Sequence, residues 1–513
     1  MRPRRIGATL LALAFPSIGM TQAAARHDER PEDPPAPARA ITTTAPASTP
    51  LGIPVSVQVN VDAAGRNIAG DAANEPSLVV DPSDPSRMAI GWRQFDSVAS
   101  NFRQAGHAYT TNGGQSWTNG GVFTPGNFRS DPVLSAGPDS TFYYDSLTGS
   151  SDFACDMFRS QDRGATWSGP TPAFGGDKAW MTVDRTGGPG RGNVYVAWSN
   201  QAGCCGDAVF IRSIDGSSTW SSPQVLPGNP IFGTLTVAPD GRLYVVGIDA
   251  DLPSKFIVDR SSNAQDRGAA PVFEQSTTVN MGGAMASGGI NPVGLLGQAW
   301  IAAAPSGAIY LLCSVASGGD PVDVMFSRSL DQGASWSAPL RVNDDAPGAW
   351  QWFGTMAVAP SGRIDVVWYD TRLDPSAATS VLTYSASSDG GASFSGNVSV
   401  SAPFQHGLGY PNQAKIGDYI HMISDDGGAN LAYAATFNGE EDVWFVRISP
   451  NGGFNADVDR SGFVDGVDLI LLGLSFGASS GDPRYNPNAD IDGSGVVDGS
   501  DLTLLASAFG RAS

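Results

Sequence analysis

The sequence predicts an all-β fold made of repeated four-stranded units, followed by a small helical module. The first observation is an octapeptide in which a hydroxyl residue, an Asp or Asn and a Gly lead into an aromatic residue. It recurs at intervals of roughly 50–65 residues, a period typical of repeat architectures. Its closest copies begin at Ser160, Ser329 and Ser387, looser ones begin at Thr110 and Ser213, and a degraded copy surrounds Asp266. The second observation is a pair of Asp-rich loops after Pro450, each followed by a stretch of helical period.

The octapeptide has the chemistry of a tight turn. A short Asp or Asn side chain accepts backbone N–H groups two residues on, and Gly permits a positive φ angle. The aromatic residue then opens a new strand with a large face to bury. The pattern resembles the Asp box of bacterial sialidases, also known as the BNR repeat. We therefore interpret these Asp residues as structural turn formers.

Strand patterns between the boxes give the number of units. Each unit begins with an apolar strand, at 76–80, 132–136, 179–183, 233–237, 299–303, 354–358 and 416–422. A turn and a second strand follow each, at 88–93, 141–145, 194–198, 243–248, 309–313, 364–369 and 431–435. A third strand leads into the box and a fourth leaves it. This count predicts seven four-stranded units within residues 54–450.

The two ends of this array predict a closed ring. The last unit ends at Asp442–Ile448 without a fourth strand, and the alternating stretch 55–61 has no partner nearby. If these stretches pair, the ring closes and hides its strand edges. The prediction is a seven-bladed β-propeller. The alternative is six blades, the usual number in sialidases, which the count of boxes alone would favour.

Composition and the N-terminus indicate export. The net charge of −20 and the pI near 4.4 argue against a nucleic-acid partner, which requires clustered Lys and Arg. Residues 1–25 have the charged start, apolar run and small-residue end of a signal peptide, with an N-terminal anchor as the alternative. Arg4-Arg5 is a weak sign of twin-arginine export. Residues 26–53 are a Pro/Ala/Thr-rich linker. We expect a secreted, cell-surface or periplasmic protein without a transmembrane segment after cleavage.

Candidate functional residues gather at one face of the predicted ring. In a meander, the Asp boxes share one face with the first–second turns, so the longer loops and blade crossings share the other. There we expect Glu75, Asp145, Asp177, Lys178 and Asp249, and six candidate substrate-binding residues: Arg93, Arg129, Arg372, Trp350, Trp352 and Tyr410. The candidate catalytic residues are Asp131, Asp370 and Asp418. We expect Arg93, Asp131, Asp370, Arg372 and Asp418 around one cavity. The alternative is a set of satisfied ion pairs lining the channel.

The resemblance to sialidases implies a retaining glycoside hydrolase acting on extracellular glycans. Such enzymes use three arginines for the substrate carboxylate, an Asp acid/base, and a Tyr activated by a Glu. Their first-unit Arg-Ile-Pro motif is replaced here by Asn74-Glu75-Pro76. Two alternatives remain: a non-catalytic propeller that binds glycans or proteins, and a structural subunit docked through its C-terminal module.

The four cysteines suit an exported protein. Cys155 lies in the second–third loop of the second unit, and Cys204 and Cys205 lie in the same loop of the third. Adjacent blades bring such loops together, so we expect a disulfide between Cys155 and either member of the pair. Cys313 ends a predicted strand and is expected to be a buried free thiol.

The C-terminal tail carries two calcium loops by the spacing of its oxygen donors. The first loop offers the side chains of Asp457, Asp459, Ser461, Asp465 and Asp468 with the backbone carbonyl of Phe463. The second offers those of Asp490, Asp492, Ser494, Asp498 and Asp501 with the carbonyl of Val496. Each runs into an apolar helical stretch. The tail resembles a dockerin domain over 453–513, which implies two Ca²⁺ ions and a cohesin-like protein partner. Gly466-Val467 and Gly499-Ser500 depart from the Ser/Thr pair of clostridial dockerins.

Overall fold

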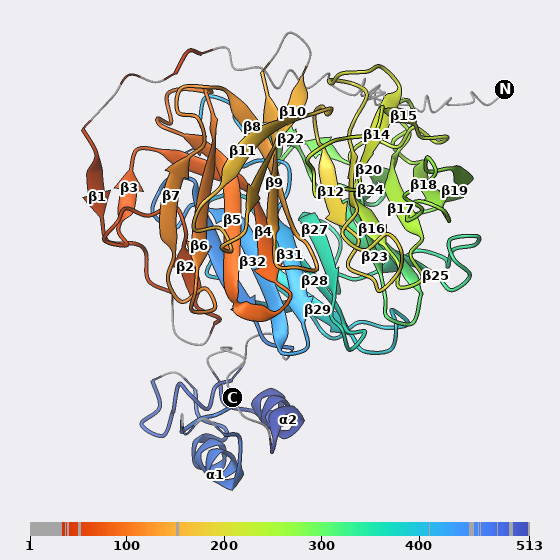
Figure 1. Ribbon diagram of the computed structural model, residues 1–513. Coiled ribbons are helices and arrows are strands. Elements are labelled where there is room, and N and C mark those ends of the chain that lie inside the picture. The colour runs from red at the N-terminus through yellow and green to blue at the C-terminus, as the bar shows by residue number, and fades with distance from the viewer. Residues whose placement is uncertain are drawn as a thin grey trace, which may run out of the picture.

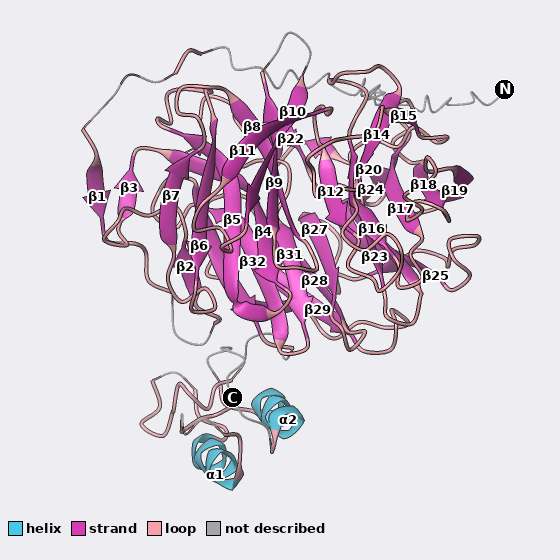
Figure 2. Ribbon diagram, viewed as in Figure 1, coloured by secondary structure: helices cyan, strands magenta, loops and turns pink. Residues whose placement is uncertain are grey.

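The computed structural model describes residues 33–35, 37, 40–49, 53–149, 153–409, 411–450, 456–459, 461, 463–479, 481–491 and 496–510. Seven antiparallel sheets form a ring, and two short helices form a small module at the C-terminal end (Figures 1 and 2). The seven-bladed prediction is therefore correct and the six-bladed alternative is wrong. The predicted signal peptide, 1–25, lies outside the described residues, as does part of the predicted linker.

Six blades are consecutive four-stranded meanders. The first three consist of β4 (Ala72–Asp81), β5 (Asp84–Phe95), β6 (Gln104–Thr110) and β7 (Thr118–Val122); β8 (Arg129–Ala136), β9 (Phe142–Thr148), β10 (Ala154–Ser160) and β11 (Ser168–Ala173); and β12 (Trp180–Val183), β13 (Val194–Ala197), β14 (Ala208–Ser213) and β15 (Gln224–Val225). The next three consist of β16 (Leu235–Val237), β17 (Leu243–Ile248), β18 (Phe256–Ser261) and β19 (Phe273–Val279); β23 (Trp300–Ala303), β24 (Ile309–Ser317), β25 (Asp320–Ser329) and β26 (Leu340–Arg341); and β27 (Gln351–Val358), β28 (Ile364–Asp370), β29 (Val381–Ser387) and β30 (Val398–Ser399).

The remaining strands are short additions to the ring. In blade five, β20 (Ala284–Met285) also pairs with β24, and β21 (Ser287–Gly288) and β22 (Asn291–Leu295) form a hairpin beside it in the chain. Near the N-terminus, β1 (Thr42–Thr44) pairs with β3 (Asn67–Ala69). β20 thus extends the sheet of blade five to five strands, whereas β1 with β3 and β21 with β22 form separate two-stranded sheets.

The seventh blade joins the two ends of the array. Its strands are β31 (His421–Asp425), β32 (Gly428–Ala435), β33 (Asp442–Ile448) and β2 (Ser56–Gln58). Ser56 lies opposite Val446 and Gln58 opposite Trp444, and the Val59 N–H donates to the Val443 carbonyl over 2.8 Å. The predicted pairing of the N-terminal stretch with the last strand is confirmed.

The Asp boxes form the turns expected from their sequence. In the second blade, Asp162 accepts hydrogen bonds from the Thr166 N–H at 2.8 Å and the Thr166 hydroxyl at 2.6 Å. Ser160 accepts the Gly164 N–H at 2.8 Å, and Gly164 has a φ angle of 90°. The same pattern recurs at Asp215, Asp331 and Asp389. These carboxylates are occupied by the turn, which confirms their structural role.

The C-terminal module consists of α1 (Gly466–Ser475) and α2 (Gly499–Ala508). Each begins with a capping box, in which Asp465 or Asp498 accepts a backbone N–H and its own N–H donates to Asp468 or Asp501. Apolar side chains from both halves share one small core, with Val464, Leu472, Ile491, Val497 and Leu505 buried. Among the described residues, no helix is long and apolar enough to cross a membrane.

Candidate functional site

Charged side chains meet on the ring axis at the face opposite the Asp boxes. Lys178 is their centre: its Nζ lies 2.8 Å from Asp418, 3.2 Å from Asp131, 3.3 Å from Asp177 and 3.9 Å from Glu75. We call the set the axial cluster; it comprises Glu75, Arg93, Asp131, Asp177, Lys178, Lys415 and Asp418. All seven side chains are 2% exposed or less. The cluster therefore closes the centre of this face with ion pairs.

The other two cations of the axial cluster reach Glu75. Arg93 Nη2 lies 3.2 Å from its carboxylate and Lys415 Nζ lies 3.7 Å from it, while Lys415 also contacts Asp418 at 2.6 Å. Burial raises the pKa of Glu75 well above its ordinary value, and Arg93 and Lys178 offset part of this rise. With four carboxylates and three cations, the cluster is close to neutral when Glu75 holds a proton.

A backbone irregularity accompanies these side chains. Glu75, Asp131 and Lys178 have φ angles of 49°, 46° and 54°, in the left-handed region that non-Gly residues rarely occupy. Glu75 and Asp131 coincide with breaks in strand register, between Asn74 and Ser77 and between Ser130 and Val133. Each such residue costs about 1–3 kcal/mol, and such strain is concentrated at functional sites. The bulges let charged residues of successive blades converge on Lys178.

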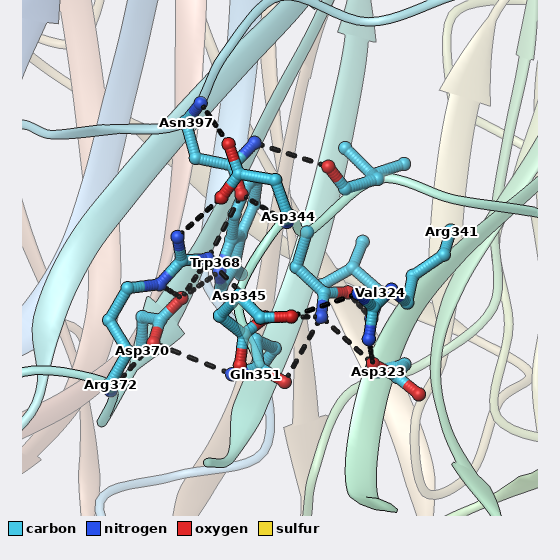
Figure 3. A network of polar contacts seen from close by, with 12 residues as sticks. Asp323, Val324, Arg341, Asp344, Asp345, Gln351, Trp368, Asp370, Arg372 and Asn397 are labelled. Carbon is cyan, nitrogen blue, oxygen red and sulfur yellow. Dashed lines mark hydrogen bonds and ion pairs between the residues drawn. The ribbon is translucent and has the colours of Figure 1, made fainter. Parts of the chain in front are cut away.

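A second polar network lies between blades five and six (Figure 3). Arg372 donates to Asp344 at 2.6 Å, Asn397 at 2.9 Å and Asp370 at 2.9 Å. Asp370 also accepts the Trp368 indole N–H at 2.8 Å. We call this set the rim network; it comprises Asp320, Asp323, Arg341, Asn343, Asp344, Asp345, Gln351, Asp370, Arg372 and Asn397. Its outer members are exposed, since the Asp344 side chain is 50% accessible and that of Arg341 is 37%.

The five residues expected around one cavity therefore belong to two networks. Arg93, Asp131 and Asp418 lie in the axial cluster, whereas Asp370 and Arg372 lie in the rim network. Asp370 is fully buried and accepts four hydrogen bonds, one each from Trp368 and Gln351 and two from Arg372. In this structure, it holds Arg372 in place.

The other candidate substrate-binding residues have different surroundings. Arg129 is buried, pairs with Asp156 at 2.8 Å and stacks over Phe158. Trp352 is fully buried against Phe353 and Tyr369, so it is a core residue rather than an exposed stacking face. Trp350 is half-buried, and its backbone pairs with Thr371 between Asp370 and Arg372. Tyr410 lies outside the described residues.

Lys415 is the cluster member that sequence reasoning missed. The whole chain contains three lysines, Lys178, Lys255 and Lys415. Lys178 and Lys415 are both buried in the axial cluster, and only Lys255 is exposed. The available signal was that lysine is rare in this chain and that it precedes a buried strand in two different units.

The cysteine pairing differs from the prediction. Cys204 and Cys205 form a disulfide with each other, and Cys155 is a buried free thiol. The predicted bridge from Cys155 is wrong, although the loops do meet as expected: the Gly175 N–H donates to the Cys204 sulfur, and Gly175 also packs on the Cys155 side chain. The partner of Cys204 is its neighbour in the chain. Cys313 is a buried free thiol, as predicted.

The C-terminal module brings acidic oxygens together. Asp457, Asp459 and Asp468 each present an oxygen, and the three lie within 4.8 Å of one another. Ser461 donates its N–H to both Asp457 and Asp459 at 2.9 Å. In the second half, Asp501 accepts the N–H groups of Ile491 and Asp498. The other predicted ligands Phe463, Asp465, Asp490, Val496 and Asp498 are among the described residues, whereas Asp492 and Ser494 lie outside them.

Comparisons with known proteins show similarity of fold only. No family model matches the chain, and no curated protein sequence matches it. Among solved structures, a protein of unknown function from Dyadobacter fermentans is 12% identical, with 78% of this chain and 98% of that chain covered and a TM-score of 0.45. A polysaccharide lyase of family PL25, an ulvan lyase, is 11% identical over 74% and 95%, with a TM-score of 0.41. The NanB sialidase of Streptococcus pneumoniae is 10% identical over 78% and 71%, with a TM-score of 0.40.

Fold and site together define a class rather than a family: a seven-bladed β-propeller with an ion-paired axis, a polar rim and an acidic C-terminal module. A proposal about its function therefore rests on the residues of this chain.

Proposed function

We propose that this chain is an exported propeller that binds extracellular glycans at the rim network. The observation that carries the proposal is the exposed edge of that network, where hydrogen bonds hold the donors and acceptors of Asp344, Arg372 and Asn397 in place. Sugar hydroxyls both donate and accept hydrogen bonds, and planar groups such as guanidinium and carboxylate bind them in pairs.

The buried part of the rim network supports binding by fixing the exposed part. Asp370 anchors Arg372 from below, and Asn343 links Asp323 to Asp345 through hydrogen bonds of 2.8 Å and 2.7 Å. Groups held in this way lose little conformational entropy when a ligand arrives. A binding role without catalysis is consistent with the surroundings of Asp370, which is fully buried and already accepts four hydrogen bonds from neighbouring residues.

A sialidase-like glycoside hydrolase is the second candidate, and the axial cluster favours it. Glycoside cleavage requires one carboxyl that keeps its proton near neutral pH and another that is ionised. Burial raises the pKa of Glu75, and Asp131 and Asp418 lie in the same cluster. Because all of these side chains are buried, a substrate would reach them only after the loops above the cluster opened.

We further propose that the C-terminal module binds two Ca²⁺ ions and docks a cohesin-like protein. The donors fit the metal: three carboxylate oxygens within 4.8 Å of one another repel strongly unless a cation lies between them. Calcium prefers oxygen ligands of this kind, and its binding energy would contribute to folding of so small a core. The docking partner follows from the resemblance of the two loop–helix units to dockerins.

The test is a parallel screen of glycan binding and hydrolysis with the full chain, over sialosides and plant and microbial polysaccharides. Arg372→Gln should weaken glycan binding by at least about tenfold, the loss expected for one charge-assisted contact. Arg260→Gln, which alters an ion pair with Glu274 elsewhere on the surface, is the matched control. If no glycan binds, or if Arg372→Gln binds as tightly as the wild type, the binding proposal is wrong. Hydrolysis abolished by Glu75→Gln would favour the second candidate.

A further inference from the structure

The central channel widens at the Asp-box face, opposite the axial cluster. A cavity of about 610 Å³ opens there, lined by the innermost strands and the turns that follow them. A deeper cavity of about 280 Å³ shares Thr182, Arg185, Thr236 and Ser424 with it, so the two belong to one channel. This volume falls within the range of small-molecule sites, roughly 300–1,000 Å³. The channel is closed by the axial cluster at one end and accessible at the other.

Arg185 is the one cationic side chain among the residues that line this cavity. No described residue forms an ion pair or a hydrogen bond with its guanidinium. The two carboxylates at the mouth have partners of their own: Asp81 pairs with Arg163 at 2.7 Å, and Asp425 pairs with Arg447 at 2.8 Å. The next carboxylate along the chain, Asp184, accepts the N–H and hydroxyl of Thr186 within its own turn.

The surroundings of Arg185 combine solvent access with partial desolvation. Its side chain is exposed to the open cavity, while the protein atoms around the channel lower the pKa of its guanidinium through burial. An unpaired charge in such a place is costly, and a bound counter-ion removes most of that cost. Hydroxyl groups line the same cavity: Thr182 and Thr236 come from blades three and four and Ser424 from blade seven, and the buried Ser424 hydroxyl has no hydrogen-bond partner among the described residues.

We propose that the Asp-box end of the channel is a binding site for a small oxyanion, with Arg185 as its charge partner and the channel hydroxyls as further donors. Sulfate and phosphate are the simplest ligands of this class, because a planar guanidinium donates to two of their oxygens at once. The site lies at the opposite end of the channel from the axial cluster and does not depend on the proposed glycan function. The overall charge of −20 repels anions at long range, so the local donors must supply the selectivity.

Isothermal titration of the full chain with sulfate, phosphate and acetate tests the proposal. The wild type should bind one sulfate or phosphate saturably, and Arg185→Gln should weaken binding at least about tenfold. Arg185→Lys should give an intermediate loss, because it keeps the charge and loses the planar fork. Arg87→Gln is the matched control, since Arg87 is an exposed arginine of the first–second turn that pairs with Asp84 on the same face.

Equal affinity of the wild type and Arg185→Gln for the anion would overturn the proposal. It would also be overturned if none of the three anions bound saturably. A second measurement uses the same variant. Sulfate should raise the thermal unfolding temperature of the wild type more than that of Arg185→Gln, because a bound ligand stabilises only the folded state that holds its site, whereas the general stabilising effect of sulfate acts on both proteins. Equal shifts in the two proteins would also refute an oxyanion site. Binding of acetate as tightly as sulfate would show that Arg185 selects charge alone and would reject tetrahedral oxyanions as its ligand class.

Discussion

Lys178 Nζ lies 2.8 Å from a carboxylate oxygen of Asp418, joining the entry of the third blade to the entry of the seventh across the ring axis. Neither side chain is exposed. Since Asp131, Asp177 and Glu75 also lie within 4 Å of this one ammonium group, its removal leaves several buried carboxylates without a counter-charge.

Lys178→Met should therefore destabilise the propeller by about 3–5 kcal/mol, the usual cost of breaking a buried ion pair from one side. The measurement is chemical denaturation at neutral pH. Lys255→Met is the control, because Lys255 forms an exposed pair with Asp249 and should change stability by about 0–1 kcal/mol. Similar small losses in both variants would show that the axial cluster contributes little to stability.

Asp145 should make stability depend on pH. Burial raises its pKa from 3.8 to about 7 in the folded protein. The folded state therefore keeps a proton that the unfolded state releases, so this contribution is full below about pH 4 and is lost as the pH rises through 7. Asp145→Asn should be nearly neutral at pH 4 and stabilising by up to about 4 kcal/mol at pH 8. Denaturation midpoints across this range would measure the effect. The control is Asp207→Asn, at an exposed carboxyl; a pH dependence unchanged by Asp145→Asn would contradict the assignment.

A substitution at Val59 should destabilise the ring, whereas the same substitution at Val55 should not. Val59 is fully buried, whereas Val55 is 69% exposed just outside the paired residues. Val59→Asp places an unpaired carboxylate in the interface between the first and last blades and should cost several kcal/mol or prevent folding. Val55→Asp should stay within about 0.5 kcal/mol of the wild type. Thermal unfolding of both variants would decide. Equal melting temperatures would mean that β2 is dispensable for closure.

The C-terminal module should respond to calcium. In the full chain, Asp457→Ala with Asp490→Ala should abolish two-site calcium binding in titration calorimetry and leave the propeller's melting transition unchanged. Asp482→Ala is the control in the same module, since Asp482 is paired with Arg484 on the surface. Calcium binding that survives the double change would rule out the two loops as metal sites.

Local sequence chemistry predicted most of the architecture. The Asp-box turns depend on contacts within five residues, such as that between Asp162 and Thr166, and the lone strand at each end implied closure. Alternation also places Trp368 and Asp370 on one side of β28, and Arg372 follows two residues after its end, so their mutual hydrogen bonds were open to inference. The contact between Lys178 and Asp418 could not be inferred, because it joins blades distant in sequence and Lys178 has a left-handed backbone conformation that no local pattern indicates. The predicted disulfide pairing was wrong because the spacing of cysteines in the sequence does not distinguish a bond between chain neighbours from a bond between adjacent loops.

The shared seventh blade also sets an order of events during synthesis. β2 must wait for β33, which the ribosome completes roughly 390 residues later. At a translation rate of about 5–20 residues per second, this delay is about 20–80 s. During that interval, the first blade has no neighbour on one side, and its apolar flank stays exposed. The propeller therefore matures only as a whole, and premature termination before the end of β33 would yield a product prone to aggregation.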